Sequence, residues 1–337
     1  MINRETKALT GVRPTGELTI GNYLGAIQPV VKMQEEFEGP VSVFVADIHG
    51  LTDQEPKTVI ATRLVAARAL LAAGIDTEKI SIYLQSQIEN QTLYLANLFD
   101  RHITPAELER VPTLKDKLKD GQGASNVNLS LFRYPILMAA DIAIQDATHV
   151  PVGEDQLSHL ELTRRLVRRF NKRYGEEDGN ILVEPESLSR KALRIAALNG
   201  RDGKMSKSRP QSAILLRDTK DEVARKVKKA QTALPGEMNE TLDSHFVVAE
   251  LLSTTPEGVD EVTKLRIAHL DGEMVMGDFK TVLTDRLNDF LADFHDRYDS
   301  IGDREVKLAL SEGGNKASDT ADAVLRRIKS SLGLDKL

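Results

Sequence analysis

Short runs of β-branched and aliphatic residues alternate with helical stretches in the first part of the chain. Lys7 to Val12, Val41 to Ala46 and Ile80 to Gln85 each have the length and residue types of a buried strand. Between the second and third runs, Lys57 to Ala73 has the apolar spacing of an amphipathic helix. Strands that alternate with helices favour a doubly wound parallel sheet, so we predict the α/β class.

The middle and the end of the chain have a mainly helical pattern. A long helical stretch precedes two further apolar runs, 181–184 and 192–197, so we expect a helical insertion at about residues 100–175 that splits a nucleotide-binding fold. Toward the C-terminus the apolar spacing is helical and no convincing strand remains. We therefore predict a Rossmann-type catalytic domain over residues 1–209 and an all-helical domain over residues 210–337.

The composition narrows the class of protein. The 337 residues are 41% hydrophobic and 28% charged, which is typical of a folded chain. Cysteine is absent, which excludes disulfides and thiolate metal sites and fits a reducing compartment. No run reaches the roughly 20 apolar residues of a membrane span. The net charge of -6 argues against a generally basic nucleic-acid binder, so any RNA contact must come from local patches. We expect a cytoplasmic protein without a membrane or DNA partner.

The first candidate site is Thr19-Ile20-Gly21-Asn22, where the first predicted strand gives way to a helix. Unpaired backbone N–H groups and the helix dipole favour phosphate at such a position. Thr19 and Asn22 are three positions apart and present polar side chains on one face, and Gly21 between them lets a flat base approach the backbone. An ordinary capped helix with a packing glycine is the alternative explanation.

The second candidate site is Lys204-Met205-Ser206-Lys207-Ser208, in a polar loop after an apolar run. Two lysines three positions apart on a mobile loop are suited to close over a triphosphate and to neutralise charge on a transferred phosphoryl group. A solvated basic linker is the usual explanation for a general lysine pair at this spacing. The full string is more specific and favours the phosphate site.

The third candidate site is a stripe on a predicted helix. Tyr134, Met138 and Asp141 fall on one face at about 100° per residue, and Pro135 suits the first helical position. An apolar slot that ends in a single acceptor matches an indole ring, whose one polar atom is an N–H donor. A phenol hydroxyl would also donate to Asp141, so the residues alone leave tyrosine open. A helix cap or a buried ion pair is the structural alternative.

Together, the first two motifs resemble the paired signatures of the class I aminoacyl-tRNA synthetases, whose first motif is usually HIGH-like and whose second is KMSKS. Both histidines of the first motif are replaced here, by Thr19 and Asn22, a variant typical of the bacterial tryptophanyl-tRNA synthetases. The strings RPTGELTIGNYLGAI, YPILMAADI and VPVGEDQLSHLELTRRLVRRFN are similar to that family and not to the tyrosyl family. The resemblance extends from about Ala8 to the C-terminal helical stretch.

The resemblance implies a tryptophan pocket made from several segments. By motif position, Asp141 accepts the indole N–H and Met138 lines the pocket. Tyr134 with Gln156 holds the α-amino group. The remaining residues implied for this pocket are His49 and Leu9. For His49, the alternative explanation is a surface histidine at the end of a strand.

An adenosine site is expected at Gly153-Glu154-Asp155-Gln156, which follows the strand-like Thr148 to Val152 and opens another helix. A glycine allows close backbone approach to the base, and an acidic residue just beyond it suits the ribose hydroxyls. Helix capping is the alternative for the acidic pair. The implied adenosine contacts are Gly153 and Asp155, and the whole implied ATP set is Arg13, Thr19, Gly21, Asn22, Gly153, Asp155, Gln156, Lys204, Met205, Ser206, Lys207 and Ser208.

Three further positions match the family less closely. Lys117 matches a lysine that reaches the ATP phosphates, but the loop after it is longer than expected, so Lys115 is the alternative. Arg13 and Thr113 stand where the family usually has glutamine. An arginine at position 13 either pairs with the tryptophan carboxylate or the α-phosphate, or it points into solvent, and the sequence leaves both open.

The activity implied by the resemblance has two steps. The tryptophan carboxylate attacks the α-phosphate of ATP and releases pyrophosphate, and the 3′ end of tRNA(Trp) then attacks the tryptophanyl-adenylate and releases AMP. Catalysis is expected from positioning and charge stabilisation with Mg²⁺ that arrives on ATP, without a structural metal in the protein. The implied catalytic residues are Thr19, Asn22, Lys117, Lys204 and Lys207.

The resemblance also implies a homodimer and an anticodon-binding role for residues 210–337. Basic residues concentrate at 164–173 and at 225–229, and either cluster would meet tRNA phosphate unless it is only a solvated helix face. Three other functions remain as alternatives: a tyrosyl-tRNA synthetase, a small-metabolite adenylyltransferase and a synthetase-like RNA-binding protein without activity. An adenylyltransferase shares TIGN-like turns but would not need the helical C-terminal domain, and the intact KMSKS and GEDQ strings argue against the RNA-binding protein.

Overall fold

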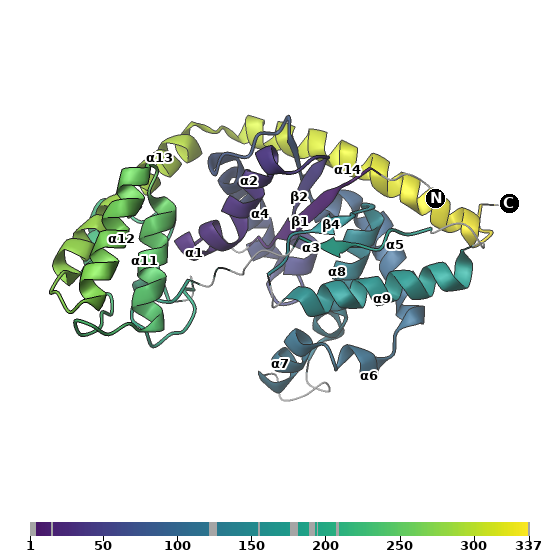
Figure 1. Ribbon diagram of the computed structural model, residues 1–337. Coiled ribbons are helices and arrows are strands. Elements are labelled where there is room, and N and C mark those ends of the chain that lie inside the picture. Colours follow the sequence, from purple (N-terminus) through teal and green to yellow (C-terminus); the bar gives the residue numbers. More distant parts are fainter. Residues whose placement is uncertain are drawn as a thin grey trace.

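A parallel five-stranded sheet, in the order β3-β2-β1-β4-β5, lies at the centre of the molecule (Figure 1). The computed structural model describes residues 5–335 except 15, 121–126, 154–155, 176–180, 189–192, 194 and 207–208. The strands are β1 (Ala8–Val12), β2 (Val41–Val45), β3 (Ile80–Leu84), β4 (His149–Val150) and β5 (Glu186–Ser187). The order is that of a doubly wound nucleotide-binding sheet, so the predicted α/β class is confirmed.

The first three strands coincide with predicted strands, but the apolar run 181–184 does not form one. Asn171 explains the difference, because its side-chain amide pairs with Leu182 as a neighbouring strand would. Its Nδ2 donates to the Leu182 carbonyl at 2.9 Å, and its Oδ1 accepts from the Leu182 N–H at 2.9 Å. Both backbone groups of Leu182 are thereby satisfied, and the edge strand forms four residues later.

The second apolar run, 192–197, also forms no strand among its described residues. Ala196 makes an isolated antiparallel bridge with Lys204 and no longer ladder. The two positions in question, 192 and 194, lie outside the described residues. The backbone of this segment therefore pairs with the loop that carries the second motif and not with the sheet.

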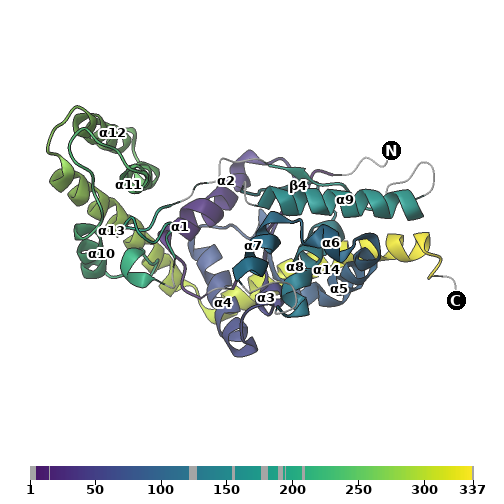
Figure 2. The same ribbon diagram turned by 90° about the horizontal axis from the view of Figure 1, so that it is seen from below.

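Helices cover the sheet and extend beyond it (Figures 1 and 2). In the described residues between β3 and β4 there are four α-helices, and the insertion at about residues 100–175 stays a prediction. The helices up to β4 are α1 (Ile20–Asn22), α2 (Gln28–Glu36), α3 (Asp47–Gly50), α4 (Pro56–Ala72), α5 (Glu89–Phe99), α6 (Pro105–Leu108), α7 (Pro112–Asp120) and α8 (Leu129–Ile144). The later ones are α9 (Leu157–Tyr174), α10 (Lys220–Lys228), α11 (Glu240–Leu252), α12 (Pro256–Leu270), α13 (Met276–Ser300) and α14 (Asp303–Ser331). None of the described helices combines the length and apolar character needed to cross a membrane.

Helix α8 begins six residues before the predicted position. The Asn128 side chain caps it by accepting from the Leu131 N–H at 2.7 Å, so the helix starts at Leu129 and Pro135 lies inside it. Asparagine is among the best capping residues, and an interior proline removes only one helical hydrogen bond at its own position. The prediction that Pro135 starts the helix was therefore wrong, although the stripe of Tyr134, Met138 and Asp141 does lie on one helix.

Two hydrophobic clusters lie on opposite faces of the sheet. One contains Val43 and Ile82 of the strands and continues into the C-terminal helices, where Phe246 and Phe279 stack at a centroid distance of 3.9 Å. The other contains Phe44 and Tyr83 together with buried residues of α5, α8 and α9. Successive side chains of a strand point to opposite faces of the sheet, so alternate strand residues enter different clusters.

The last helix, α14, crosses from one face of the sheet to the other at the edge strand β3. Its first half contributes Val306 and Leu310 to the first cluster, and its second half contributes Ala317 and Ala321 to the second. At the crossing, a Cβ added to Gly313 would lie 2.0 Å from the carbonyl oxygen of Ile82, so only glycine lets the helix backbone approach the strand this closely. The C-terminal helix therefore covers an edge that would otherwise be open.

Candidate active site

The candidate site lies where the strand order reverses, between β1 and β4. In open α/β sheets this switch point leaves a crevice outside the carboxyl ends of the strands. Strand β1 leads directly to Arg13, and β4 leads through Pro151 and Val152 to Gly153. The structure thus brings the segment before the first motif and the start of the GEDQ string to the same edge of the sheet.

The first motif folds as a capped turn. The Thr19 hydroxyl accepts from the Asn22 backbone N–H at 3.1 Å, and the Asn22 Oδ1 accepts from the Thr19 backbone N–H and hydroxyl, both at 3.0 Å. Helix α1 then continues through a π-helical turn, Tyr23–Ile27, into α2. The backbone of this motif therefore forms a capped helix, as the alternative explanation held. The cap also fixes the orientation of the Asn22 amide.

The KMSKS loop packs against this turn. Met205 is buried, and its N–H donates to the Ile195 carbonyl at 2.9 Å. A Cβ added to Gly21 would lie 3.4 Å from the Ile195 Cβ and 3.7 Å from the Met205 Cβ, so the two motifs are in contact distance at this glycine. Lys204 is exposed and Ser206 is half-buried, whereas Lys207 and Ser208 lie outside the described residues.

A hydrogen-bonded triangle joins α7, α8 and α9. The Tyr134 hydroxyl donates to the Thr113 Oγ1 at 3.1 Å, and the His159 Nε2 lies 2.9 Å from that oxygen and 3.0 Å from the tyrosine oxygen. The Lys117 ammonium lies over the Tyr134 ring, 4.4 Å from its centroid. Lys115 is exposed on the same helix, so the structure places Lys117 and not Lys115 beside Tyr134.

Asp141 is a buried carboxylate whose hydrogen bonds come from one amide. Its side chain is 3% exposed, and the Gln85 Nε2 lies 2.8 Å from each of its two oxygens. Burial raises the pKa of Asp141 to about 8, the Gln85 hydrogen bond opposes this shift, and the charge of Asp47 adds to it. A capped helix end or an ion pair, the structural alternatives for this residue, are not what the described residues form.

His49 lies among positive charges. Its ring meets the Tyr134 ring edge to face at a centroid distance of 5.5 Å. Burial is the main cause that lowers the pKa of His49 to about 4, and the charges of Arg13 and Lys117 act in the same direction. His49 is therefore neutral at pH 7, and the surface-histidine alternative does not fit its burial.

Arg13 forms an ion pair with Asp53, and each side chain is about two-fifths exposed. Its charge acts on both His49 and Lys117, and burial together with Arg13 lowers the pKa of Lys117. The role of Arg13 toward the substrates stays a prediction. Asp53 holds the guanidinium at the edge of the site, beside the two groups whose charge it influences.

The other predicted residues are spread more widely. Met138 packs half-buried against the second cluster. Gln156 lies at the position before α9, and its N–H donates to the Gly153 carbonyl at 2.9 Å. Leu9 is buried at the opposite end of β1, in the wall of a cavity of about 160 Å³ that Gln145 also lines. Asp155 lies outside the described residues.

Sequence reasoning missed Gln85, Asp47 and His159. Asp47 accepts from the Ser86 N–H at 2.9 Å and the Ser86 hydroxyl at 2.6 Å, so it ties the end of β2 to the end of β3. Asp47 and Gln85 were detectable in principle, because each is the first strongly polar residue after a buried parallel strand whose carboxyl end lies at the same edge of the sheet as the site. His159 gave no such signal, because it lies on the buried face of an amphipathic helix.

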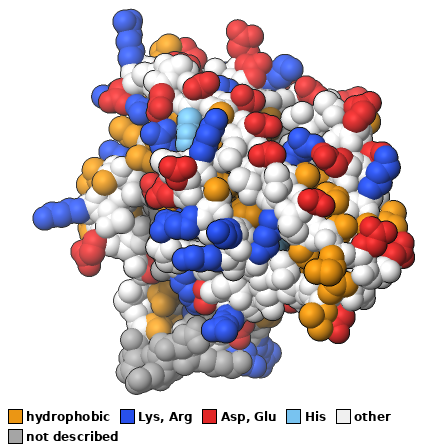
Figure 3. Space-filling model, turned by 90° about the vertical axis from the view of Figure 1, so that its left-hand side faces the viewer, with side chains coloured by type: hydrophobic (Ala, Val, Ile, Leu, Met, Phe, Trp, Pro, Cys, Tyr) orange, Lys and Arg blue, Asp and Glu red, His pale blue; other side chains and the backbone are white. Residues whose placement is uncertain are grey.

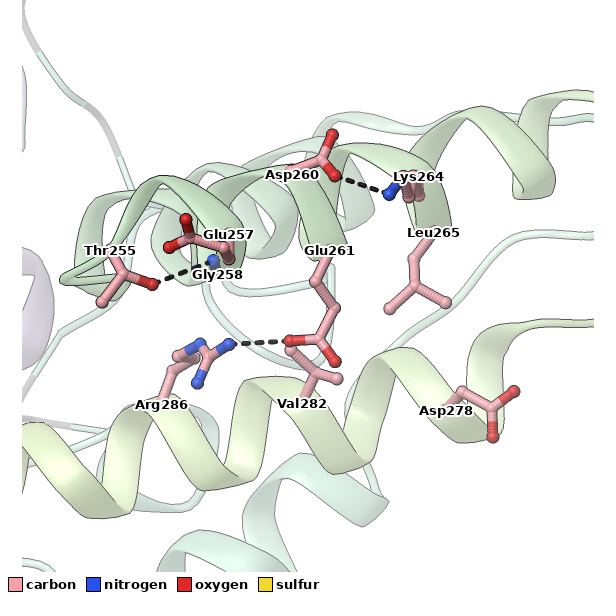
Figure 4. Close-up of a pocket in the computed structure, with 10 residues that line it drawn as sticks. All are labelled: Thr255, Glu257, Gly258, Asp260, Glu261, Lys264, Leu265, Asp278, Val282 and Arg286. Atoms are coloured by element: carbon pink, nitrogen blue, oxygen red, sulfur yellow. Dashed lines mark hydrogen bonds and ion pairs between the residues drawn. The ribbon is translucent and has the colours of Figure 1, made fainter.

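A groove of about 750 Å³ lies far along the C-terminal helices, between α12 and α13 (Figure 4). Its lining includes four acidic side chains and only two basic ones, and the basic ones are paired: Lys264 with Asp260 at 2.6 Å and Arg286 with Glu261 at 2.7 Å. Phosphate would meet excess negative charge there, so the groove does not compete with the sheet edge as a nucleotide site. Within the described ranges, no group of three His, Cys, Asp or Glu side chains is arranged to hold a metal ion.

Sequence comparisons agree on one family. The chain matches the family model described as tRNA synthetases class I (W and Y) over residues 1–292. The tryptophan--tRNA ligase of Helicobacter pylori is 35% identical to it, over 97% of this chain and 98% of the relative. The tryptophan--tRNA ligase of Synechocystis sp. is 38% identical over 97% of each chain.

Solved structures give the same result. The tryptophanyl-tRNA synthetase from Mycoplasma pneumoniae aligns with a TM-score of 0.83 and 30% identity, over 98% of each chain. The tryptophanyl-tRNA synthetase from Campylobacter jejuni, complexed with ADP and tryptophan, aligns with a TM-score of 0.80 and 30% identity over 98% of this chain and 100% of that one. A tyrosyl-tRNA synthetase from Aeropyrum pernix, at 20% identity and a TM-score of 0.71, shares the fold.

Proposed function

This chain belongs to the class I tRNA synthetases of tryptophan and tyrosine, and we propose that it is the enzyme for tryptophan. It activates L-tryptophan with ATP to tryptophanyl-adenylate and transfers the tryptophanyl group to tRNA(Trp). The observation that carries this conclusion is the match to relatives named tryptophan--tRNA ligase over nearly the full length of both chains. The buried acceptor Asp141 supports it independently, because an indole ring needs one acceptor and otherwise apolar walls.

Tryptophan would occupy the space in front of Tyr134, Met138 and Asp141. The Asp141 carboxylate accepts the indole N–H, while Met138 supplies an apolar wall. The edge-to-face contact of His49 with Tyr134 supports a second wall made of neutral rings. Tyr134 and Gln156 bind the α-amino group. Such a site selects against phenylalanine, because a ring without a donor leaves the buried carboxylate unpaired, which can cost roughly 10⁴-fold in rate.

Asn22 is the ATP ligand that the first motif supports best. Its Oδ1 is occupied by Thr19, so its Nδ2 donors are the part of the amide left for another group. An amide N–H beside a helix start is suited to a phosphate oxygen. Thr19, whose hydroxyl is engaged with Asn22, then holds that amide in place, and Gly21 lies beneath the adenine.

Charge on the triphosphate would be balanced by lysines from two sides. Lys117 approaches from α7 and Lys204 with Lys207 from the KMSKS loop, while Mg²⁺ bound to ATP completes the neutralisation. The contact of Gly21 with Met205 supports this arrangement, because it holds the loop beside the turn that carries Asn22. These residues lower the barrier by stabilising charge in the transition state and not by covalent chemistry.

The two basic clusters differ in what surrounds them. On α9, Arg164 and Arg168 are paired with Glu184, and Arg169 is paired with Glu107 at 2.6 Å. Much of that positive charge is therefore neutralised. An ion pair uses up the charge that a phosphate group would otherwise attract. We expect the weaker contribution to tRNA binding from this helix.

The basic residues of α10 are the better candidates for tRNA contact. Arg225, Lys228 and Lys229 are exposed, and no ion pair involves them in the described part of the chain. On this side of the molecule, Lys and Arg side chains form a small group with acidic side chains around it (Figure 3). The Gln231 N–H donates to the Leu198 carbonyl at 2.7 Å, so the end of α10 lies beside the segment that leads to the KMSKS loop. Phosphate contacts there would bring RNA close to the adenylate.

The enzyme is expected to be a cytoplasmic homodimer whose C-terminal helices contact the anticodon. Size-exclusion chromatography with light scattering should give twice the chain mass of 37.3 kDa. A monomeric mass at micromolar concentration would contradict the dimer without affecting the proposed activity.

The proposed function is tested by ATP–pyrophosphate exchange with each of the amino acids, followed by aminoacylation of purified tRNA. Only tryptophan should support exchange, and only tRNA(Trp) should be charged. Comparable exchange with tyrosine would identify a tyrosyl-tRNA synthetase. Tight tRNA binding without exchange would identify a non-catalytic RNA-binding protein.

A further inference from the structure

Gln85 is a buried amide that joins two segments of the proposed tryptophan pocket. It follows β3 directly, and its relative exposure is 0%. Its Oε1 accepts from the His49 backbone N–H at 2.9 Å, and its Nε2 lies 2.8 Å from both oxygens of Asp141. One side chain therefore connects α3 with α8 beneath the pocket.

The two partners determine which way the amide points. A backbone N–H only donates, and an ionised carboxylate only accepts, so the glutamine oxygen must face His49 and the glutamine nitrogen must face Asp141. A shorter or an apolar side chain at this position would leave at least one of these buried groups without its partner. Such a group keeps its full desolvation penalty, so the amide is held in one orientation.

Among the described residues around Asp141, this hydrogen bond is the one influence that opposes protonation. Asp47 on α3 and Tyr83 on β3 are its titratable neighbours, and Arg63 on α4 lies 3.5 Å from Asp47. Among the charges that act on Asp141 in the described residues, none is positive. Burial and Asp47 both favour the protonated form and raise the pKa of Asp141, and the Gln85 hydrogen bond is the influence that favours the carboxylate.

We propose that Gln85 is a positioning residue for tryptophan selection, which orients the Asp141 carboxyl group toward a ring N–H and favours its ionised form. The inference rests on the proposed function, because it takes the bound ring to be an indole. An ionised Asp141 has lone pairs left beyond those used by Gln85, and these receive the indole N–H. A protonated Asp141 uses one oxygen to hold its proton and has fewer and weaker acceptor positions, so the selection for a ring N–H would be weakened.

The test compares tryptophan with β-(3-benzothienyl)alanine, an analogue of similar shape in which sulfur replaces the ring N–H. ATP–pyrophosphate exchange gives kcat and KM for both amino acids with the wild type and with Gln85→Met. Methionine is unbranched and of similar length, so it can fill the same space without the amide. The preference for tryptophan should fall at least about tenfold in Gln85→Met, mainly through KM, while the analogue changes by less than about twofold.

Gln87→Met is the matched control. Gln87 lies two residues away in the same turn, where its Oε1 accepts from the Leu84 N–H at 2.8 Å and its Nε2 donates to the Leu310 carbonyl at 3.0 Å. It holds the same end of β3 but makes no hydrogen bond to Asp141 or His49 in the described residues. Its loss should therefore leave the preference between the two amino acids unchanged.

A pH profile separates a positioning role from a structural one. In the wild type, kcat/KM for tryptophan should rise with pH as Asp141 loses its proton, while the analogue shows no such rise. Without the Gln85 amide, the pKa of Asp141 is higher and the rise must move to higher pH. A side chain that only fills space would weaken binding without moving the profile.

If circular dichroism shows that Gln85→Met does not fold, Gln85→Glu is used in its place. It keeps an oxygen for the His49 N–H and places a second carboxyl against Asp141, and the two carboxyls cannot readily ionise together. Its tryptophan preference should be lost at neutral pH. The inference is overturned if either folded variant keeps the wild-type preference, or if its kcat/KM falls equally for both amino acids. A wild-type protein that does not use tryptophan at all would instead overturn the proposed function.

Discussion

At the scale of single residues, Asp141 shows how a binding site can oppose stability. Its pKa of about 8 lies above the ordinary value of 3.8, so the folded chain holds this proton more tightly than the unfolded chain does. The stability gained from the buried acid is complete below pH 4 and is lost as the pH rises toward 8. The group that recognises the ligand therefore weakens the free protein at neutral pH.

Asp141→Asn should raise the melting temperature of the ligand-free protein at pH 8, with a smaller gain as the pH approaches 4. The same change should weaken tryptophan by about 1 to 3 kcal/mol, because the acceptor becomes an uncharged amide, while the KM for ATP stays nearly constant. Thermal unfolding at several pH values and exchange kinetics measure the two effects. If the variant weakens ATP binding as strongly as tryptophan binding, Asp141 supports the whole site and not only the contact with the indole ring.

Arg13→Gln tests whether the guanidinium acts on the substrates. The Arg13–Asp53 pair is partly exposed, so its removal should cost less than about 1 kcal/mol of stability. Its charge lies beside Lys117, so its loss should raise the KM for ATP several-fold and increase sensitivity to indole-based inhibitors. Asp53→Asn should have the opposite effect on ATP, because it releases Arg13 and removes a negative charge. Unchanged constants in both variants would place the pair outside the active site.

The residues of the site were only partly predictable from the sequence. Tyr134, Met138 and Asp141 lie on one helix, so their spacing sufficed to group them. Gln85 and Asp141 are 56 positions apart, and Thr113 and His159 are 46 apart. Such contacts depend on how separate helices pack, and a single sequence carries no local pattern for them.

At the scale of secondary structure, the glycines of α14 determine how closely it approaches β3. Gly313→Ala should destabilise the protein by about 1 to 3 kcal/mol, because the added Cβ meets the backbone of Ile82, which cannot rotate away. Gly314→Ala should cost less, because its Cβ meets the flexible side chain of Gln87. Urea unfolding followed by circular dichroism gives both values.

Gly277→Ala is the control for this series, since a Cβ there meets nothing within 4 Å and the residue lies in the first turn of α13. It should be neutral or stabilise by up to about 1 kcal/mol, through helix propensity. Equal costs at Gly313 and Gly277 would mean that the close approach of α14 to β3 has no energetic importance.

The elements themselves were predicted well where the pattern was local. β1, β2 and β3 have the strand period, and the helices after residue 220 have the helical one. The errors came from single side chains that satisfy backbone groups: Asn171 replaces a strand at Leu182, and Asn128 starts α8 early. The π-helical turn after the first motif has no sequence pattern that distinguishes it from an α-helix.

At the scale of the whole molecule, buried histidines make stability depend on acid. Burial lowers the pKa of His245 on α11 to about 4, and its Nε2 has no hydrogen-bond partner among the described residues. The folded protein therefore needs His245 neutral. Its stabilising effect is complete above pH 6.5 and is lost as the pH falls toward 4.

His245→Leu should raise the melting temperature at pH 5 relative to the wild type, and less so at pH 7.5. Differential scanning calorimetry at both values tests this. The His245 Nε2 makes no hydrogen bond in the described residues, so its replacement removes none, and exchange kinetics at pH 7.5 serve as the control and should be unchanged. An equal shift at both pH values would point to packing and not to protonation.

The crossing of α14 over β3 has a consequence for the order of events during synthesis. Residues 303–331 leave the ribosome well after residues 80–84, yet they cover the edge of the strand that those earlier residues form. Until α14 has emerged, the nascent chain carries an exposed strand edge that is open to pairing with other chains. Products that terminate before α14 therefore lack the helix that covers the edge of the central sheet. We expect them to be substrates for chaperones and proteases.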